Sequence, residues 1–546
     1  MKKLSSFYIA ICMIILLAAG CKKGWVDVNY NPQDLTDNNA TPDVLLPSVL
    51  DAATGPVEQW PLSLWMGYWS HWNMNVNYPL VSYLRIQDYG PNFQYLRARP
   101  RPEIYYLESK SRVLGQTFYE GVAKVMKALS WSEAVDMVNN MPYTDAYNSK
   151  ILQPRYDNGQ YIYEQLMLEL DSAITLIKNA GDLQSPKIGL ADIMFHGNKT
   201  SWVKFINTLK LRLLVHQANR PERQAYITGI IDGIVAEGSG FLESGMDASV
   251  NPGYSVANRH FSKYFSNFSS HNFVFGGGFF DAVGQFGSTQ VAHANFYALE
   301  LLKKDADPRI GLFYSSVDTE LQPGDPEPFE QSDPQEYRGN KFGLALNEAS
   351  FPFQNSVYVS AVGGSRNVLA KTAESKGIIK GLDMNDWIMT SIESKFLQAE
   401  AVQRGWIPGD AEAAYKEAVM ESFRWLNAGA DANDPGASDA IFENWYNDQV
   451  TAGNDEVSWT ASPDKYKLLM YQKYIAFNGI APLESWTDYR RNGRYPDVPV
   501  SLSPSRVGTG LPIRLLYNEN EYVVNTPNVT AQGQIDNFSS KIWWMP

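Results

Sequence analysis

The sequence predicts a mainly α-helical protein, a tetratricopeptide-like helical-repeat scaffold that carries a loop-rich face. Three observations predict it. Several segments repeat apolar residues every three or four positions, as helices that bury one side do. Two of these segments are separated by only five residues, which makes them antiparallel neighbours. Long stretches between the helices are dense in Gly, Pro, Asn, Ser and aromatic residues.

Three of the first four helical segments show start or stop signals as well as apolar stripes. The second begins at Asp157, with Gln160 completing a capping box, and Gly181 ends it. The third begins at about Thr200, and the fourth ends at Gly405. Their stripes, in chain order, are Phe118, Val122, Val125 and Leu129; Ile162, Leu166, Leu170, Ile174 and Ile177; Trp202, Phe205, Leu209, Leu213 and His216; and Ile388, Ile392, Phe396 and Ala399.

The fifth helical segment begins at Asp410. Its Ala411, Tyr415 and Ala418 follow the spacing of the second helix of a tetratricopeptide repeat, where small residues let two helices approach closely. We therefore expect a helical scaffold over about 105–240 and 385–495. The loop-rich face is expected over about 65–102, 245–380 and 428–463, because loops of this length in compact proteins usually carry function.

The N-terminus predicts export and lipid attachment. Lys2 and Lys3 precede an apolar stretch of signal-peptide length, which ends in small residues before Cys21. We expect residues 1–20 to be a signal peptide, 21–42 a tether lipidated at Cys21, and 43–546 a single domain. Cys12 would leave with the signal peptide, so the mature chain would have no internal disulfide and no cysteine for catalysis.

Composition narrows the function classes. The formal charge is −13, and it becomes −15 once Lys2 and Lys3 are removed, which disfavours nucleic acid and anionic lipid surfaces as partners. The chain contains 15 Trp, 31 Tyr and 25 Phe, and such rings stack on sugars and peptides as well as filling cores.

Motifs along nearly the whole chain resemble the SusD/RagB family of nutrient-binding outer-membrane lipoproteins of Bacteroidetes, and its SusD-like branch in particular. The matching elements are Pro142 to Ala146, Trp202 to Arg212, Asp307 to Arg309, Glu400 to Trp406, Gln472 to Ala476, Glu484 to Arg491 and Leu511 to Arg514. This resemblance implies a tetratricopeptide-like scaffold and a lid on a TonB-dependent, SusC-like outer-membrane transporter. It also implies capture of a glycan or peptide at the cell exterior, without catalysis.

The densest candidate for ligand binding runs from Trp65 to Phe93. Trp65 and Trp69 are one helical turn apart and are assigned to the core. The residues after them alternate aromatic rings with amides, a mixture that stacks on sugar rings and pairs with their hydroxyls. The proposed ligand residues are Trp72, Asn73, Asn75, Asn77, Tyr78, Tyr83 and Arg85.

Two further segments are alternative binding loops or transporter contacts. The first runs from Tyr254 to Phe280 and includes His260, Tyr264 and Phe265; Gly276 to Gly278 would give it backbone freedom. The second runs from Gln354 to Asn367 and includes Asn355, Tyr358 and Arg366.

No pattern predicts an enzyme, a cofactor or a metal site. The six histidines lack paired metal-ligand spacing, and His216 continues an apolar stripe and is assigned to the core. The acids and arginines of Glu484 to Arg491 are interpreted as an internal ion-pair network. The calcium-like fragment Asp305 to Arg309 is interpreted as a salt-bridged turn after a helix.

The sequence thus predicts a non-enzymatic surface lipoprotein that binds oligosaccharides and delivers them to a TonB-dependent transporter. A peptide ligand is the alternative within the same class. A lipid-anchored glycoside hydrolase is the alternative from another class, although no pair of carboxylates is singled out for it.

Overall fold

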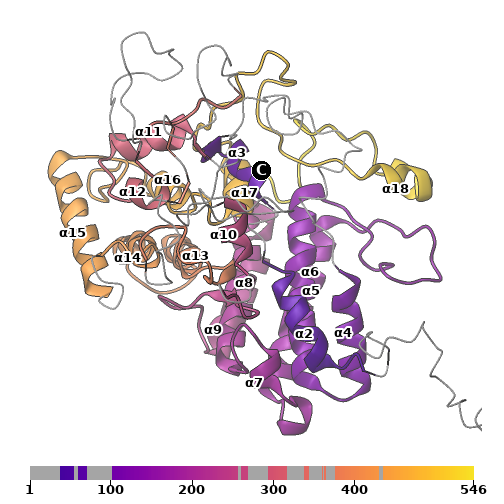
Figure 1. Ribbon diagram of the computed structural model, residues 1–546. Coiled ribbons are helices and arrows are strands. Elements are labelled where there is room, and N and C mark those ends of the chain that lie inside the picture. The colour runs from indigo at the N-terminus through magenta and orange to yellow at the C-terminus, as the bar shows by residue number, and fades with distance from the viewer. Residues whose placement is uncertain are drawn as a thin grey trace, which may run out of the picture.

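The computed structural model describes residues 37, 39–54, 59–70, 101–255, 260–268, 293–316, 337–343, 359–360, 362–363, 375–429 and 435–546. Helices dominate these residues, and Figure 1 shows them in two packed groups with α8 and α13 near the middle. The predicted helical fold is therefore confirmed. Within the described part of the chain, no helix has both the length and the hydrophobicity needed to cross a bilayer.

The N-terminal group packs around α5 (Thr117–Val138) and α6 (Gly159–Lys178), which contact each other. The two helices predicted to be neighbours, α13 (Ser391–Gln403) and α14 (Ala411–Trp425), also pack together. Apolar residues of α2, α4, α5, α6, α8 and α9 share one core, with Trp202 and Phe205 of α8 fully buried in it. The helices of this group are α2 (Pro42–Asp51), α4 (Pro102–Val113), α5 (Thr117–Val138), α6 (Gly159–Lys178), α7 (Ile188–Ala191), α8 (Lys199–His216) and α9 (Gln224–Glu237), with 3-10 turns η2 (Asp182–Gln184) and η3 (Pro221–Arg223).

The C-terminal group forms a second core around α14 and α16. Its helices are α3 (Trp60–Trp65), α10 (Lys263–Phe268), α11 (Phe296–Lys304), α12 (Ile310–Phe313), α13 (Ser391–Gln403), α14 (Ala411–Trp425), α15 (Pro435–Ala452), α16 (Lys465–Ala476) and α17 (Pro482–Arg491), and α18 (Glu519–Val524) and α19 (Thr526–Thr530) follow. The strands are short: β1 (Trp69–Ser70) pairs with β3 (His293–Ala294), and β2 (Ala248–Val250) pairs with β4 (Asp386–Met389).

The prediction of a loop over 428–463 is wrong, because α15 occupies half of that range. Its aromatic residues recur at helical spacing and pack on α14: the rings of Phe442 and Trp445 lie 5.6 and 5.5 Å from that of Phe423. Pro435 stands at the start of the helix, where its missing N–H costs no hydrogen bond. The density of aromatic residues therefore marked a packed helix rather than a binding loop.

Helix caps confirm one predicted start and correct another. Asp410 caps α14, because its side chain accepts a hydrogen bond from the backbone N–H of Ala413. The cap of α6 is Asn158 rather than Asp157, and it accepts from Gln160 N–H at 2.9 Å. Asp157 instead accepts from the backbone N–H groups of Tyr143 and Thr144, and so holds the 142–146 turn against the start of α6.

Helix α13 belongs to both cores. Ile392 and Phe396 lie in the C-terminal core, whereas Leu397 and Ala401 lie in the N-terminal core. Its predicted first stripe residue, Ile388, lies in strand β4 instead. Because α13 is covered on both sides, both helical groups pack against it.

Candidate functional site

The seven proposed ligand residues, Trp72, Asn73, Asn75, Asn77, Tyr78, Tyr83 and Arg85, lie outside the described residues, as do Cys21 and the named residues Asn355, Tyr358 and Arg366 of the 354–367 segment. Some described residues nevertheless lie within or close to the candidate segments, and they show how these parts of the chain pair with one another. They come from four separate parts of the chain.

Strands β1 and β3 join the 65–93 candidate segment to a part of the chain that follows the 254–280 candidate segment. Ser70 is the antiparallel partner of His293. Ser70 is the last residue before the undescribed range 71–100, and His293 is the first after the undescribed range 269–292. The Ser70 hydroxyl also donates to the carbonyl of Ala294 at 3.0 Å. Ser70, within the 65–93 segment, and His293, which follows the 254–280 segment, are therefore direct neighbours.

Ser360, which lies within the 354–367 candidate segment, and Asn340 are hydrogen-bonded to the same strand. The backbone N–H of Ala294 donates to Ser360 O at 2.8 Å, and that of Asn340 donates to Ala294 O at 3.0 Å. Gly339 is required here, since a Cβ atom would lie 2.6 Å from the backbone nitrogen of Phe296. We call this group, Trp69–Ser70, His293–Asn295, Arg338–Asn340 and Ser360, the stem platform.

Buried hydrogen bonds attach the stem platform to the helical scaffold. The Tyr68 ring stacks on that of Tyr474 with centroids 4.6 Å apart, and its hydroxyl donates to Tyr474 O at 2.8 Å. Tyr314 donates its hydroxyl to Tyr68 O, and the Asn295 side chain donates to Trp69 O. All of these side chains are buried, so the platform is firmly attached to the helical scaffold.

The core assignment of the first aromatic residues is confirmed: Trp65 and Trp69 are both fully buried. The described part of the 254–280 segment is also mostly structural, which corrects that candidate. Tyr254 donates its hydroxyl to Asp386, the Tyr264 hydroxyl donates to Gly479 O, and Phe265 has no exposed surface. His260 alone among the named residues described in this segment is exposed.

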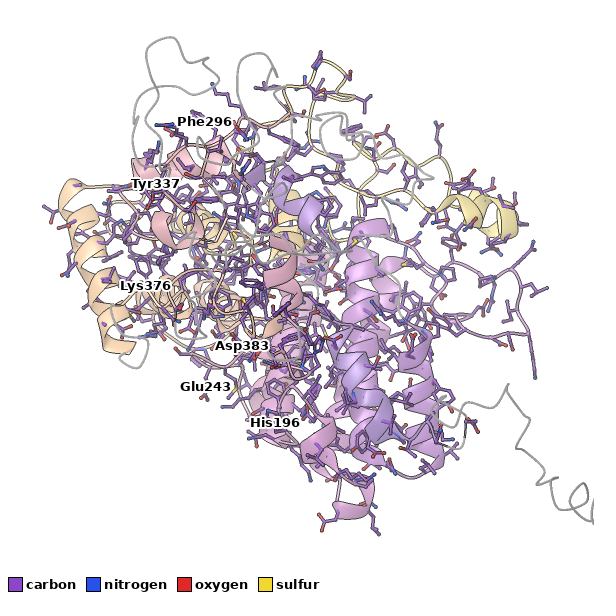
Figure 2. All side chains as sticks on the ribbon, in the orientation of Figure 1. His196, Glu243, Phe296, Tyr337, Lys376 and Asp383 are labelled. Carbon is purple, nitrogen blue, oxygen red and sulfur yellow. The ribbon has the colours of Figure 1, made fainter. Side chains whose placement is uncertain are left out.

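Sequence reasoning missed partly exposed side chains at the edge of the platform. Phe296 follows directly after Asn295, and the ammonium of Lys341 lies 4.9 Å above its ring. Figure 2 shows Phe296 and Tyr337 on the side of the molecule occupied by α11. The signal available in the sequence was Asn295 itself. It is a typical helix-capping residue, its side chain accepts from Tyr297 N–H, and it marks Phe296 as the first residue of α11.

The charged residues of α17 form the predicted internal network. Arg491 makes two bonds of 2.8 and 2.6 Å to Glu400, and both side chains are fully buried. Burial opposes ionisation of Glu400, but Arg491 and Arg404 outweigh it and hold the pKa of its carboxyl well below the usual range. Arg490 lies 3.5 Å over the Trp486 ring and donates to the backbone carbonyl of Asp136, so it is closed to a substrate carboxylate.

His216 is buried as predicted, but contacts with two carboxylates fix its position as well as apolar packing. Its Nε2 lies 2.8 Å from Glu484, and its Nδ1 lies 3.3 Å from Asp136. Glu484 and Arg212 also line a cavity of about 20 Å³ between α8, α13 and α17. That volume suits a single water molecule and excludes a sugar ring, so this buried network supports the scaffold.

The calcium-like fragment is the predicted salt-bridged turn. Arg309 donates to both carboxylate oxygens of Asp307, and Asp305 accepts from the Tyr471 hydroxyl at 2.7 Å and the Asn454 amide at 3.0 Å. Burial raises the pKa of Asp305 to about 6. Across the described ranges, no group of three His, Cys, Asp or Glu residues is arranged to hold a metal ion.

Most of the chain matches one known protein family. This SusD-like family, described as "Starch-binding associating with outer membrane", matches residues 63–518. The chain belongs to this family. The SusD-like fold is also seen in a SusD homologue of Bacteroides fragilis (18% identity, TM-score 0.66, covering 92% of this chain and 99% of that one).

Two further solved structures share the fold. A SusD-like protein of Bacteroides thetaiotaomicron is 19% identical with a TM-score of 0.66, and the alignment covers 92% of this chain and 98% of that one. A chitin-binding protein is 18% identical with a TM-score of 0.65, covering 92% and 99%. At this identity the likeness shows the fold alone. No curated protein matches the sequence.

Proposed function

We propose that this SusD-like chain is a cell-surface lipoprotein that binds an oligosaccharide and delivers it to a partner TonB-dependent, SusC-like transporter. The stem platform is the observation that carries the proposal. In this platform, Ser70 of the 65–93 segment, Ser360 of the 354–367 segment and His293, which follows the 254–280 segment, belong to one hydrogen-bonded group. All three segments are rich in aromatic and amide side chains. Aromatic rings and amides from separate loops can then converge on one ligand.

The proposed ligand contacts are Trp72, Asn73, Asn75, Asn77, Tyr78, Tyr83 and Arg85. Phe296, at the edge of the stem platform, is a further candidate. Aromatic rings stack on the C–H faces of sugar rings, and the amides and the guanidinium pair with hydroxyls. The lipid on Cys21 would hold this binding surface at the outer membrane, and tethering raises its effective concentration near the transporter.

The proposal assigns binding and no catalysis. The described acids near the centre of the molecule, Glu393, Glu400 and Glu484, are all buried and accept from Arg or His side chains. They are therefore unavailable as the exposed acid and base that glycoside hydrolysis requires. The family description supports a saccharide as the ligand class.

Calorimetric titration with starch-derived and chitin-derived oligosaccharides tests the proposal. We expect Trp72→Ala and Tyr78→Ala each to weaken binding about tenfold or more, since each removes a stacking ring. Tyr161→Ala is the matched control, because Tyr161 is an exposed tyrosine on α6, away from the stem platform.

Three outcomes would count against the proposal. Equal losses of affinity in the control and in the two test variants would contradict the assignment of Trp72 and Tyr78 to the ligand site. Binding of peptides with no binding of glycans would favour the peptide alternative. Release of shortened glycan products during incubation would favour a glycoside hydrolase.

A further inference from the structure

A projecting arm of the molecule exposes an unusual share of its apolar surface. The arm consists of residues 143–157 and 517–532. Among the described residues, fifteen large apolar side chains are exposed, and five of them lie on this arm. They are Tyr147, Leu152, Tyr522, Val523 and Val524. Soluble proteins rarely gather such side chains on one projection unless it contacts another molecule.

The arm is a built structure, because side chains join its two segments. Asn525 donates to Pro154 O at 2.8 Å, and Asn528 donates to Gln153 O at 3.0 Å. The Tyr156 hydroxyl donates to Glu521 at 2.9 Å. Figure 1 shows α18 standing clear of the helical groups, beside the 140–157 segment. The apolar side chains are therefore presented outward from an ordered base.

The arm continues onto the surface where the N-terminal tether reaches the folded body. Tyr147 lies on the Tyr105 ring of α4, with centroids 4.5 Å apart. On the same helix, the Tyr106 hydroxyl donates to Asp37, and Lys110 lies 3.5 Å from that carboxylate. Cys21 is 16 residues before Asp37, a reach of at most about 58 Å. A lipid on Cys21 would therefore keep this face within that distance of the membrane.

We propose that the arm is the surface through which this chain docks on the extracellular side of its membrane-embedded transporter. This inference rests on the proposed function, which supplies the partner, and the structure supplies the face. The two segments contain Asp145, Asp157, Glu519 and Glu521 against Lys150 and Arg155. Their net charge of −2 opposes insertion into an anionic lipid surface and favours a protein partner with an apolar groove.

A single introduced thiol tests the face in intact cells. The chain has only two cysteines, at positions 12 and 21, so Val523→Cys adds one distinct reactive group on the arm. Val235→Cys on α9 is the matched control, since Val235 is also well exposed, at 55% against 72% for Val523. Both variants are labelled with a thiol-reactive photo-crosslinker, and the products are identified by mass spectrometry.

We expect the Val523→Cys variant to form a crosslink to the transporter that the Val235→Cys variant lacks. Equal crosslinking by both variants would overturn the inference, and so would a product of Val523→Cys that contains only lipid or a second copy of this chain. Copurification of the transporter with the unmodified chain is measured in parallel. Copurification without the crosslink overturns the arm alone, whereas no copurification overturns the proposed partner as well.

A charge substitution gives an independent readout. Val523→Glu should lower the amount of copurified transporter at least about tenfold, because it places a charge in an apolar contact. Affinity for the glycan and the melting temperature should stay unchanged, since Val523 is exposed and distant from the stem platform. Unchanged copurification by this variant would contradict the proposed face.

Discussion

Raising the pH should weaken the folded state through one buried histidine. Both ring nitrogens of His216 face carboxylates, Nε2 that of Glu484 and Nδ1 that of Asp136. Burial lowers the pKa of this imidazole, but the two carboxylates outweigh burial and raise the pKa to about 9 from the model-peptide value of 6.5. The folded protein therefore keeps a buried imidazolium at neutral pH.

The sign and size of the effect follow from linkage. Because the folded pKa is the higher one, the stabilisation is fully present below pH 6.5 and is lost as the pH rises through 9. Each unit of pKa difference is worth about 1.4 kcal/mol, so the whole contribution is roughly 3 kcal/mol. A loss of that size is a large part of the stability of an ordinary domain.

Urea unfolding of the wild type and of His216→Gln, at pH values from 6 to 9, measures this contribution. The variant also loses hydrogen bonds, so its stability at one pH is not decisive. The readout is the difference in unfolding free energy between the two proteins, in which the titration of other groups cancels. We expect this difference to shrink by roughly 3 kcal/mol between pH 6 and pH 9. A constant difference, or one that grows with pH, would refute the reasoning.

Substitutions at three other residues test the scaffold and the platform. Arg491→Met should cost about 3–5 kcal/mol in urea unfolding, because it leaves the buried carboxylate of Glu400 without its bidentate partner; a loss below 1 kcal/mol would contradict the network. Asp192→Ala should cost about 2–3 kcal/mol by thermal unfolding, since Asp192 accepts from three backbone N–H groups and the Trp202 indole, and Asp192→Asn should recover part of it. Asn295→Ala should weaken glycan binding while lowering stability by only about 1–2 kcal/mol, because Asn295 joins β1 to the start of α11; calorimetry that shows unchanged affinity would separate the platform from the ligand site.

Apolar spacing and capping residues predicted the scaffold well. The predicted cap at Asp410 is the observed cap of α14, and the stripes of α5, α6 and α8 are buried as expected. These signals are local, because a helix of this length shows its buried side within two or three turns. The same rule, applied to Trp65 and Trp69, placed both side chains in the core correctly.

The errors came from residues whose role depends on distant partners. The aromatic residues of α15 resembled a binding loop because their partner, Phe423 of α14, lies about twenty residues earlier in the chain. The core assignment of His216 was correct, but its charged environment could not be predicted, since Asp136 and Glu484 come from α5 and α17. The stem platform could not be predicted at all, because it joins four segments by backbone hydrogen bonds that leave no sequence pattern.

The position of α13 constrains how such a protein could move while it captures a nutrient. Its residues fill both cores at once, so rotating one helical group against the other would open apolar surface on both sides of a single helix. A packed core resists gradual deformation of that kind. Any large motion would then have to turn the two helical groups together as one rigid piece. The stem platform, which is hydrogen-bonded to this scaffold, would keep its shape during such a motion.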